Sequence, residues 1–272
     1  RLAKTMLMSA VAPEVHALKN LTPQRLAALN HGSIVSPLAG GEASIVLATV
    51  RKWAEVIPEI RIEGEGRDAV IRVQLADVDY ESIVERAKHA DTDAARRELI
   101  RTFVGGAIGI ADGASADMQG AYALEPIWRG TRRRVDVIFG NVRDHSWLSD
   151  DHFRAAPGTW RVIIDHPFDT AGHSSSEDRR RLETMKAARF TSRTFVWLPR
   201  FVSDETLRKM RRYVILQWLL ASEERWRTNA EHLSEGDRQQ ARGILEGQRT
   251  NLRDSITSAL KQAYGVTDPQ PG

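Results

Sequence analysis

Residues 162–169 read VIIDHPFD, and their types and order could support chemistry at a metal ion. An apolar strand that ends in Asp165 places a carboxylate where α/β proteins bind ligands. ATPases hold Mg²⁺ with an acid in this position. Asp169 and His173 follow, so one interpretation is a divalent-metal site of Asp165, Asp169 and His173, as in a self-contained phosphoesterase or nucleoside triphosphatase. The alternative is a strand-end carboxylate that caps a loop or pairs with an arginine.

A second candidate is a basic cluster beside an aromatic side chain. It consists of Trp128, Arg129, Arg132, Arg133 and Arg134. Such a cluster can bind phosphate or stack on a nucleic-acid base, which predicts nucleic-acid contact. It can equally guard a sheet edge or pair with acids of a partner domain. The net charge of +3 is too small to demand a nucleic-acid partner, which favours the second interpretation while the first stays open.

Several kinds of chemistry are excluded by what the sequence lacks. There is no cysteine, which excludes disulfides, thiolate catalysis and Cys-ligated metal centres. No G-x-x-x-x-G-K-[ST] phosphate loop occurs, and the Gly-rich stretch 105–120 contains no lysine. The serines at 174–176 stand outside a G-x-S-x-G nucleophile motif. No cofactor is therefore expected in this chain. No run of about 18 apolar residues predicts a transmembrane helix.

The order of elements in residues 1–76 predicts a winged helix-turn-helix domain. Helical patterns at 2–11, 22–29 and 42–57 precede two alternating strands at 59–63 and 69–75, with a Gly-containing turn at 64–68. Such domains bind DNA through the third helix. Here that helix carries Arg51 and Lys52 against Glu42 and Glu55, so a structural or protein-contact role is the favoured alternative.

The remaining residues predict three further parts. Residues 77–120 form a helical connector with helices at 79–88 and 93–108, and residues 223–272 form a C-terminal helical segment. Between them, residues 121–222 alternate apolar strands at 132–142, 160–166 and 192–198 with helical segments. This alternation indicates an α/β module with a small, mostly parallel sheet. The fold class is therefore α+β or α/β with long C-terminal helices.

Several phrases in a fixed order resemble a known family, the PglY-like ATPases of phage growth limitation (BREX-type) antiviral defence systems. The chain begins at Arg1 within a helical pattern, which predicts an internal section of a longer protein. The resemblance runs along essentially the whole chain. The phrases that carry it are KT at 4–5, APEV at 12–15, LT at 21–22, RLAALNHGSI at 25–34, WRGTRR at 128–133, FGNVR at 139–143, IDHPFD at 164–169, GH at 172–173 and VWLP at 196–199.

The resemblance carries its own implications, which the residues alone do not give. It implies a middle section of a large cytoplasmic ATPase, in which ATP and Mg²⁺ bind at a phosphate loop elsewhere in the parent protein. It also implies partners: other domains of the parent, proteins of the same defence system and phage DNA. No catalytic residue transfers to this chain. The expected function is thus a non-catalytic section that makes interdomain, partner-protein or DNA-backbone contacts.

Overall fold

The computed structural model describes residues 1–12, 15–38, 40–73, 78–111, 113–170, 172–188 and 192–266. The predicted end of the second strand at Leu75, the predicted domain boundary at residues 76–77 and the terminus 267–272 lie outside these residues. The chain divides into two compact units. The first unit comprises Arg1–Ala90 and Ile215–Ser255, and the second comprises Asp91–Val214 and Ile256–Gly272. The four-part division made from the sequence stays a prediction.

The first unit starts with helices followed by a two-stranded hairpin. The side chain of Thr22 accepts a hydrogen bond from the Arg25 amide at 3.2 Å, and Pro23 takes the first helical position, so the sequence sets the start of α2. The two strands pair antiparallel, which confirms the predicted hairpin around residues 64–68. The elements are α1 (Leu2–Val11), η1 (His16–Leu18), α2 (Pro23–Leu29), α3 (Glu42–Ala54), β1 (Ile60–Glu63), η2 (Gly66–Asp68) and β2 (Val70–Val73).

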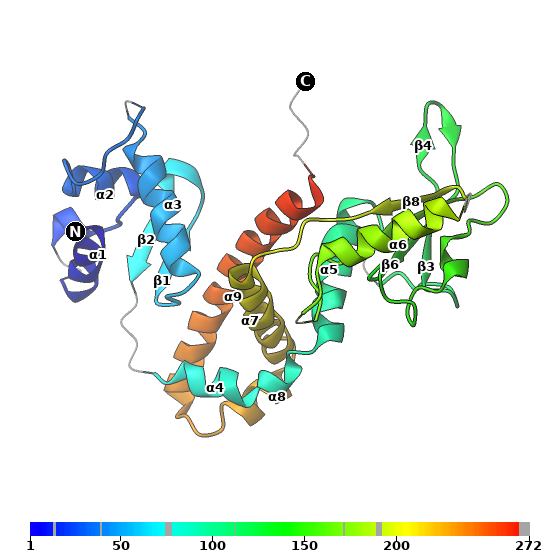
Figure 1. Ribbon diagram of the computed structural model, residues 1–272. Helices are drawn as coiled ribbons and strands as arrows, with labels where there is room; N and C mark the ends of the chain where they lie inside the picture. Colours follow the sequence, from blue (N-terminus) through cyan, green and yellow to red (C-terminus); the bar gives the residue numbers. More distant parts are fainter. Residues whose placement is uncertain are drawn as a thin grey trace. The chain divides into compact units, whose positions relative to one another are not determined.

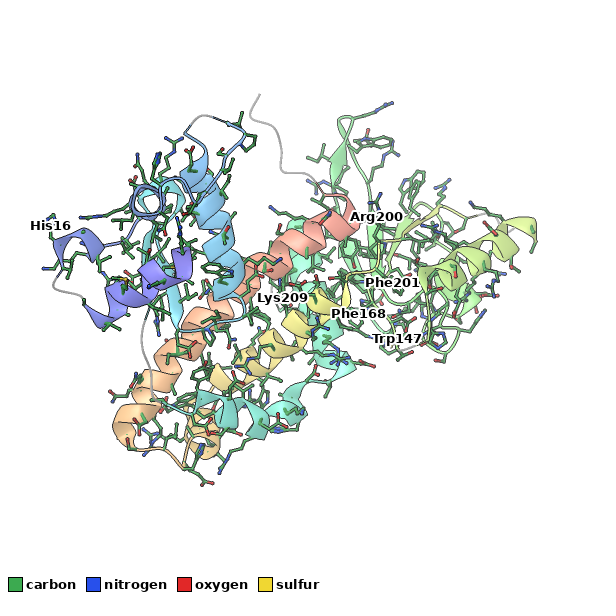
Figure 2. All side chains as sticks on the ribbon, turned by 60° about the vertical axis from the view of Figure 1, so that its left-hand side comes forward. His16, Trp147, Phe168, Arg200, Phe201 and Lys209 are labelled. Carbon is green, nitrogen blue, oxygen red and sulfur yellow. The ribbon has the colours of Figure 1, made fainter. Side chains whose placement is uncertain are left out.

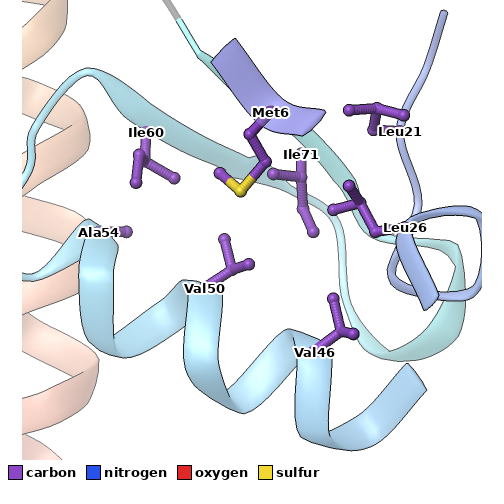
Figure 3. Packing of buried hydrophobic residues seen from close by; sticks show 8 residues of the cluster. All are labelled: Met6, Leu21, Leu26, Val46, Val50, Ala54, Ile60 and Ile71. Atoms are coloured by element: carbon purple, nitrogen blue, oxygen red, sulfur yellow. The ribbon is translucent and has the colours of Figure 1, made fainter. Parts of the chain in front are cut away.

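A compact apolar core joins these helices to the hairpin (Figure 3). Val46, Val50 and Ala54 recur at helical spacing on one face of α3, and each is at most 1% exposed. They meet strand residues Ile60 and Ile71 from β1 and β2. The other buried members come from α1, α2 and the segment between them: Met6, Leu21 and Leu26. Burial of one face of α3 therefore fixes the helices on the hairpin.

The rest of the first unit is helical. It contains α4 (Tyr80–Arg86), η3 (Lys88–Ala90), α8 (Glu223–Asn229) and parts of α7 (Asp204–Leu220) and α9 (Glu235–Tyr264), which continue into the second unit. Asp79 caps α4 by accepting a hydrogen bond from the Ser82 amide at 3.1 Å. Two contacts tie α4 to the segment after α8: Ser82 Oγ lies 2.6 Å from His232 Nε2, and Arg86 pairs with Glu231 at 3.1 Å.

The second unit is built on a small mixed sheet (Figure 1). Its four strands lie in the order β3-β6-β7-β8, with β6, β7 and β8 parallel and β3 antiparallel to β6. The sequence predicted the parallel strands but not β3. The elements are α5 (Asp93–Ala107), β3 (Ala121–Leu124), β4 (Ile127–Trp128), β5 (Thr131–Arg132), β6 (Val135–Phe139), η4 (Asp150–Phe153), β7 (Trp160–Ile164), α6 (Ser175–Ala187) and β8 (Thr194–Trp197).

The two faces of this sheet are covered differently. On one face, Ile138 and Ile163 are buried in a cluster against which Leu182 and Met185 of α6 pack. On the other face, aromatic contacts cover the carboxyl half of the strands. Trp197 meets Tyr264 of α9 edge to face at 5.5 Å, and Phe139 meets Tyr122 of β3 at 6.2 Å. These two contacts do not reach the amino half of the strands on that face.

Candidate functional site

In the structure the residues of the predicted basic cluster form a short β-hairpin. β4 and β5 pair antiparallel, with Ile127 opposite Arg132 and Trp128 opposite Thr131. Arg129 and Gly130 form the two-residue turn, and both have positive φ, at 50° and 72°. A two-residue turn of this kind matches the twist of paired strands, and the glycine takes its conformation without steric cost. We call residues 125–134 the arginine hairpin; all ten are exposed.

The side chains of the arginine hairpin leave most of its positive charge open to solvent. The Arg129 guanidinium lies 5.1 Å from the centre of the Trp128 ring, a cation–π distance. Arg132 lies 3.4 Å from Glu125, and both side chains are more than half exposed, so this pair is weak. Arg134 lies 4.0 Å from Asp136. The five residues predicted to contact nucleic acid therefore gather on one projecting ribbon (Figure 1).

Asp165 lies at the carboxyl end of β7, where the sequence placed it, but it is buried. The residue is 1% exposed, and its carboxylate accepts hydrogen bonds from the His166 amide at 2.8 Å and from the Val142 amide. Burial, followed by the nearby charge of Asp178, raises the pKa of Asp165 to about 8. In this environment the protonated form of Asp165 is favoured at neutral pH.

Asp178 brings a second buried carboxyl group to the same place. It lies in the first turn of α6, is 1% exposed, and accepts a hydrogen bond from the Arg143 amide at 2.9 Å. The amides of Val142 and Arg143 are consecutive, so the two carboxyl groups meet at the end of β6. Burial raises the pKa of Asp178 as well, and its Oδ2 has no hydrogen-bond partner among the described residues.

The other two residues of the predicted metal site are engaged elsewhere. Asp169 forms a bidentate ion pair with Arg143, which holds the pKa of Asp169 low although burial opposes its ionisation. His173 Nδ1 lies 2.9 Å from Glu177 Oε2. In the part of the chain that the structure describes, no three His, Asp or Glu side chains converge as a metal site would require. The metal interpretation thus has no geometric support.

These contacts fix the carboxyl ends of β6 and β7 to α6. Arg181 of α6 is buried and donates to the Val142 carbonyl at 2.6 Å and to Asp150 at 2.7 Å. Asn141 Nδ2 donates to the carbonyl of Phe168 at 3.3 Å, and Trp147 Nε1 donates to the carbonyl of Phe139 at 3.3 Å (Figure 2). The spacing of the sequence did not reveal this network, because Asp178 and Arg181 reach the strand ends only through the packing of α6.

A groove of about 450 Å³ lies beside this network. Its charged lining is mixed, so it does not form a purely cationic or anionic site. The lining includes Arg143, His145, Asp150, Glu177, Arg180 and Arg181. Asp150 is paired with Arg181, and Arg143 with Asp169, so most of these charges are neutralised within the unit.

Comparison with known families agrees with the resemblance seen in the sequence. Residues 83–272 match the model described as PglY fourth domain. The chain belongs to the PglY family. Residues 1–66 match the model described as the BREX System ATPase PglY protein 2nd domain, so the hairpin strand β1 and the helices before it are PglY sequence as well. No solved structure matches the chain.

Membership of the PglY family places the chain in a multidomain protein of a BREX defence system. The arginine hairpin, Asp165 and α6 all fall within the match to the fourth domain of PglY. Only 16 residues, 67–82, separate the two matches. Within the described residues, no helix combines the length and apolar character that a membrane span requires.

Proposed function

We propose that this section of a PglY protein is a non-catalytic binding module that holds the backbone of nucleic acid during antiphage defence in the cytoplasm. The arginine hairpin carries this proposal. It presents four exposed arginines and Trp128 on one ribbon, and only Glu125 lies within the hairpin as an opposing charge. Arginine binds phosphate through several donors, and an exposed aromatic ring beside it can stack a base. Other domains of the parent and defence-system partners are the further contacts we propose.

The first unit supports a structural rather than a DNA-reading role in this proposal. Its order of α1, α2, α3, β1 and β2 is the order of a winged helix, and we propose that architecture for it. On α3, Arg51 and Lys52 are exposed, but Glu42 and Glu55 leave the helix nearly neutral. A helix that neutralises several phosphates would need a larger positive charge. The winged helix is therefore proposed as a scaffold or protein contact.

The proposal assigns no cofactor to this chain. ATP and Mg²⁺ belong to the parent protein, because the sequence has no phosphate loop to cradle the β- and γ-phosphates. The protonated, buried Asp165 gives no reason to place Mg²⁺ here. We expect the isolated chain to release no phosphate from ATP in a malachite-green assay. Turnover abolished by Asp165→Asn would contradict this part of the proposal.

Fluorescence anisotropy with labelled DNA tests the arginine hairpin directly. We expect weak binding without sequence preference. The salt slope on a log–log plot should become shallower by about 0.9 for each phosphate that the protein no longer neutralises. The double variant Arg132→Gln, Arg133→Gln should weaken binding to every sequence. The matched control, Arg179→Gln with Arg180→Gln, removes the same charge from exposed positions of α6 and should change binding little.

Two outcomes would overturn the proposal. One is sequence-selective binding that is lost in the double variant Arg51→Gln, Lys52→Gln but is unchanged in the double variant Arg132→Gln, Arg133→Gln. That result would show that α3 works as a recognition helix. Absence of binding at low salt would leave the arginine hairpin as a contact for another protein domain.

A further inference from the structure

A row of apolar side chains crosses the sheet at the base of the arginine hairpin. The strand register places Leu124 opposite Val135, and Val135 beside Trp160. The ring of Trp160 stacks on that of Phe195 at 5.4 Å, with 18° between the ring planes. These side chains lie on one face because paired residues of neighbouring strands point to the same side. The row therefore runs from the hairpin to the edge strand β8.

This row occupies the half of the sheet face that the aromatic contacts described above do not cover. Nearer the carboxyl ends of the strands, Tyr264 covers Trp197 and Tyr122 covers Phe139. At the amino ends, by contrast, Phe195 is 59% exposed and Trp160 is only partly buried. Two nearly parallel rings, one of them largely exposed, form a platform on which another flat ring can stack.

Two arginines adjoin the aromatic pair along the backbone. Arg134 lies next to Trp160, whose amide donates to the Arg134 carbonyl at 2.9 Å. Arg193 precedes β8 and is exposed, and the Arg161 amide donates to its carbonyl at 3.0 Å. With the arginine hairpin this gives five exposed arginines, two of which pair with acids, Arg132 with Glu125 and Arg134 with Asp136. The Arg134 side chain pairs with Asp136, which alternates with Val135 and so lies on the other face of the sheet; the cations available to the row are therefore those of the rest of the arginine hairpin and Arg193.

We infer that the nucleic acid bound by this unit is single-stranded. This inference rests on the proposed function and names its ligand class. Unpaired bases can stack on Phe195 and on Trp128, while the arginines hold the backbone between them. In a duplex the faces of the bases are already stacked on each other, so a duplex can use the arginines but not the rings. The platform would therefore add affinity only for a single strand.

The test compares a labelled oligo(dT) with a duplex of equal length at one salt concentration. We expect the unaltered chain to bind oligo(dT) more tightly. Phe195→Ala should weaken oligo(dT) binding by about five- to 100-fold, the range for one base–aromatic stack, and leave duplex binding unchanged. Trp147→Ala is the matched control, because Trp147 is also 59% exposed but lies at the carboxyl edge of the sheet. Circular dichroism melting checks that both variants fold, and Phe195→Tyr, which keeps a ring, should retain binding.

The outcomes separate this inference from the proposed function. If the duplex binds as tightly as oligo(dT), or if Phe195→Ala binds oligo(dT) normally, the single-strand inference is wrong. In that case the arginine hairpin remains the proposed binding site if the double variant Arg132→Gln, Arg133→Gln weakens the binding of both ligands. If neither ligand binds the unaltered chain, the proposed function and the single-strand inference are both wrong.

Discussion

Asp165→Asn should change the pH dependence of stability in a way that identifies the buried acid. In the native state Asp165 keeps its proton up to about pH 8, whereas in the unfolded chain it loses it near its ordinary pKa of 3.8. The native state therefore binds more protons between these values, and stability falls as the pH rises through them. Asp178, whose pKa is also raised by burial, acts in the same direction.

His166 opposes this trend over part of the range. Burial, with the charge of Arg97, lowers its pKa from 6.5 to about 4. The unfolded chain binds the extra proton between these values, so the contribution of His166 to stability rises with pH there and stops rising near pH 6.5. Up to that point the slopes of Asp165 and His166 cancel. Above it His166 no longer offsets Asp165, and Asp165 by itself should cost about 2 kcal/mol by pH 8 at about 1.4 kcal/mol per unit, with Asp178 acting in the same direction.

The assay is urea denaturation at a series of pH values. The unaltered chain should show a plateau and then a decline as the pH rises from 6.5 to 8. Asp165→Asn cannot ionise, so its stability should rise up to pH 6.5 and then decline much less than that of the unaltered chain. Asp151→Asn, whose side chain is 89% exposed, is the control and should keep the decline. A decline of equal size in Asp165→Asn would refute the assignment of a buried proton to Asp165.

Three further substitutions test the packing. Leu26→Ala, at a side chain that is 0% exposed, should cost about 2–5 kcal/mol in urea denaturation, and a cost below about 1 kcal/mol would contradict its place in the core. Thr22→Ala removes the cap of α2 and should cost about 1 kcal/mol, while Thr22→Ser should cost little; equal losses would exclude the cap as the cause. Gly140→Ala would place its Cβ 2.6 Å from Cδ1 of Trp147, so Trp147 must move. Tryptophan emission should then shift to longer wavelength, and an unchanged spectrum would count against this contact.

Much of the local structure could be predicted because its causes are local. The Thr22-Pro23 start of α2, the apolar stripe of α3 and the glycine turn between β1 and β2 depend on residues close in sequence, and all are present. The gathering of arginines near Trp128 was visible for the same reason. The order of several phrases also indicated the PglY family, which the two domain matches confirm.

Tertiary structure alone decided which of these residues meet. The sequence placed Asp165 at a strand end, but its raised pKa comes first from burial and then from Asp178, which α6 brings back across 13 residues of chain. The stack of Trp160 on Phe195 depends on the parallel pairing of β7 with β8, whose partners lie 33 residues apart. β3 was not predicted from the sequence, and it joins the sheet through antiparallel pairing with β6. Local sequence sets the elements, whereas burial and strand register, which are properties of the whole unit, set the chemistry of the side chains they carry.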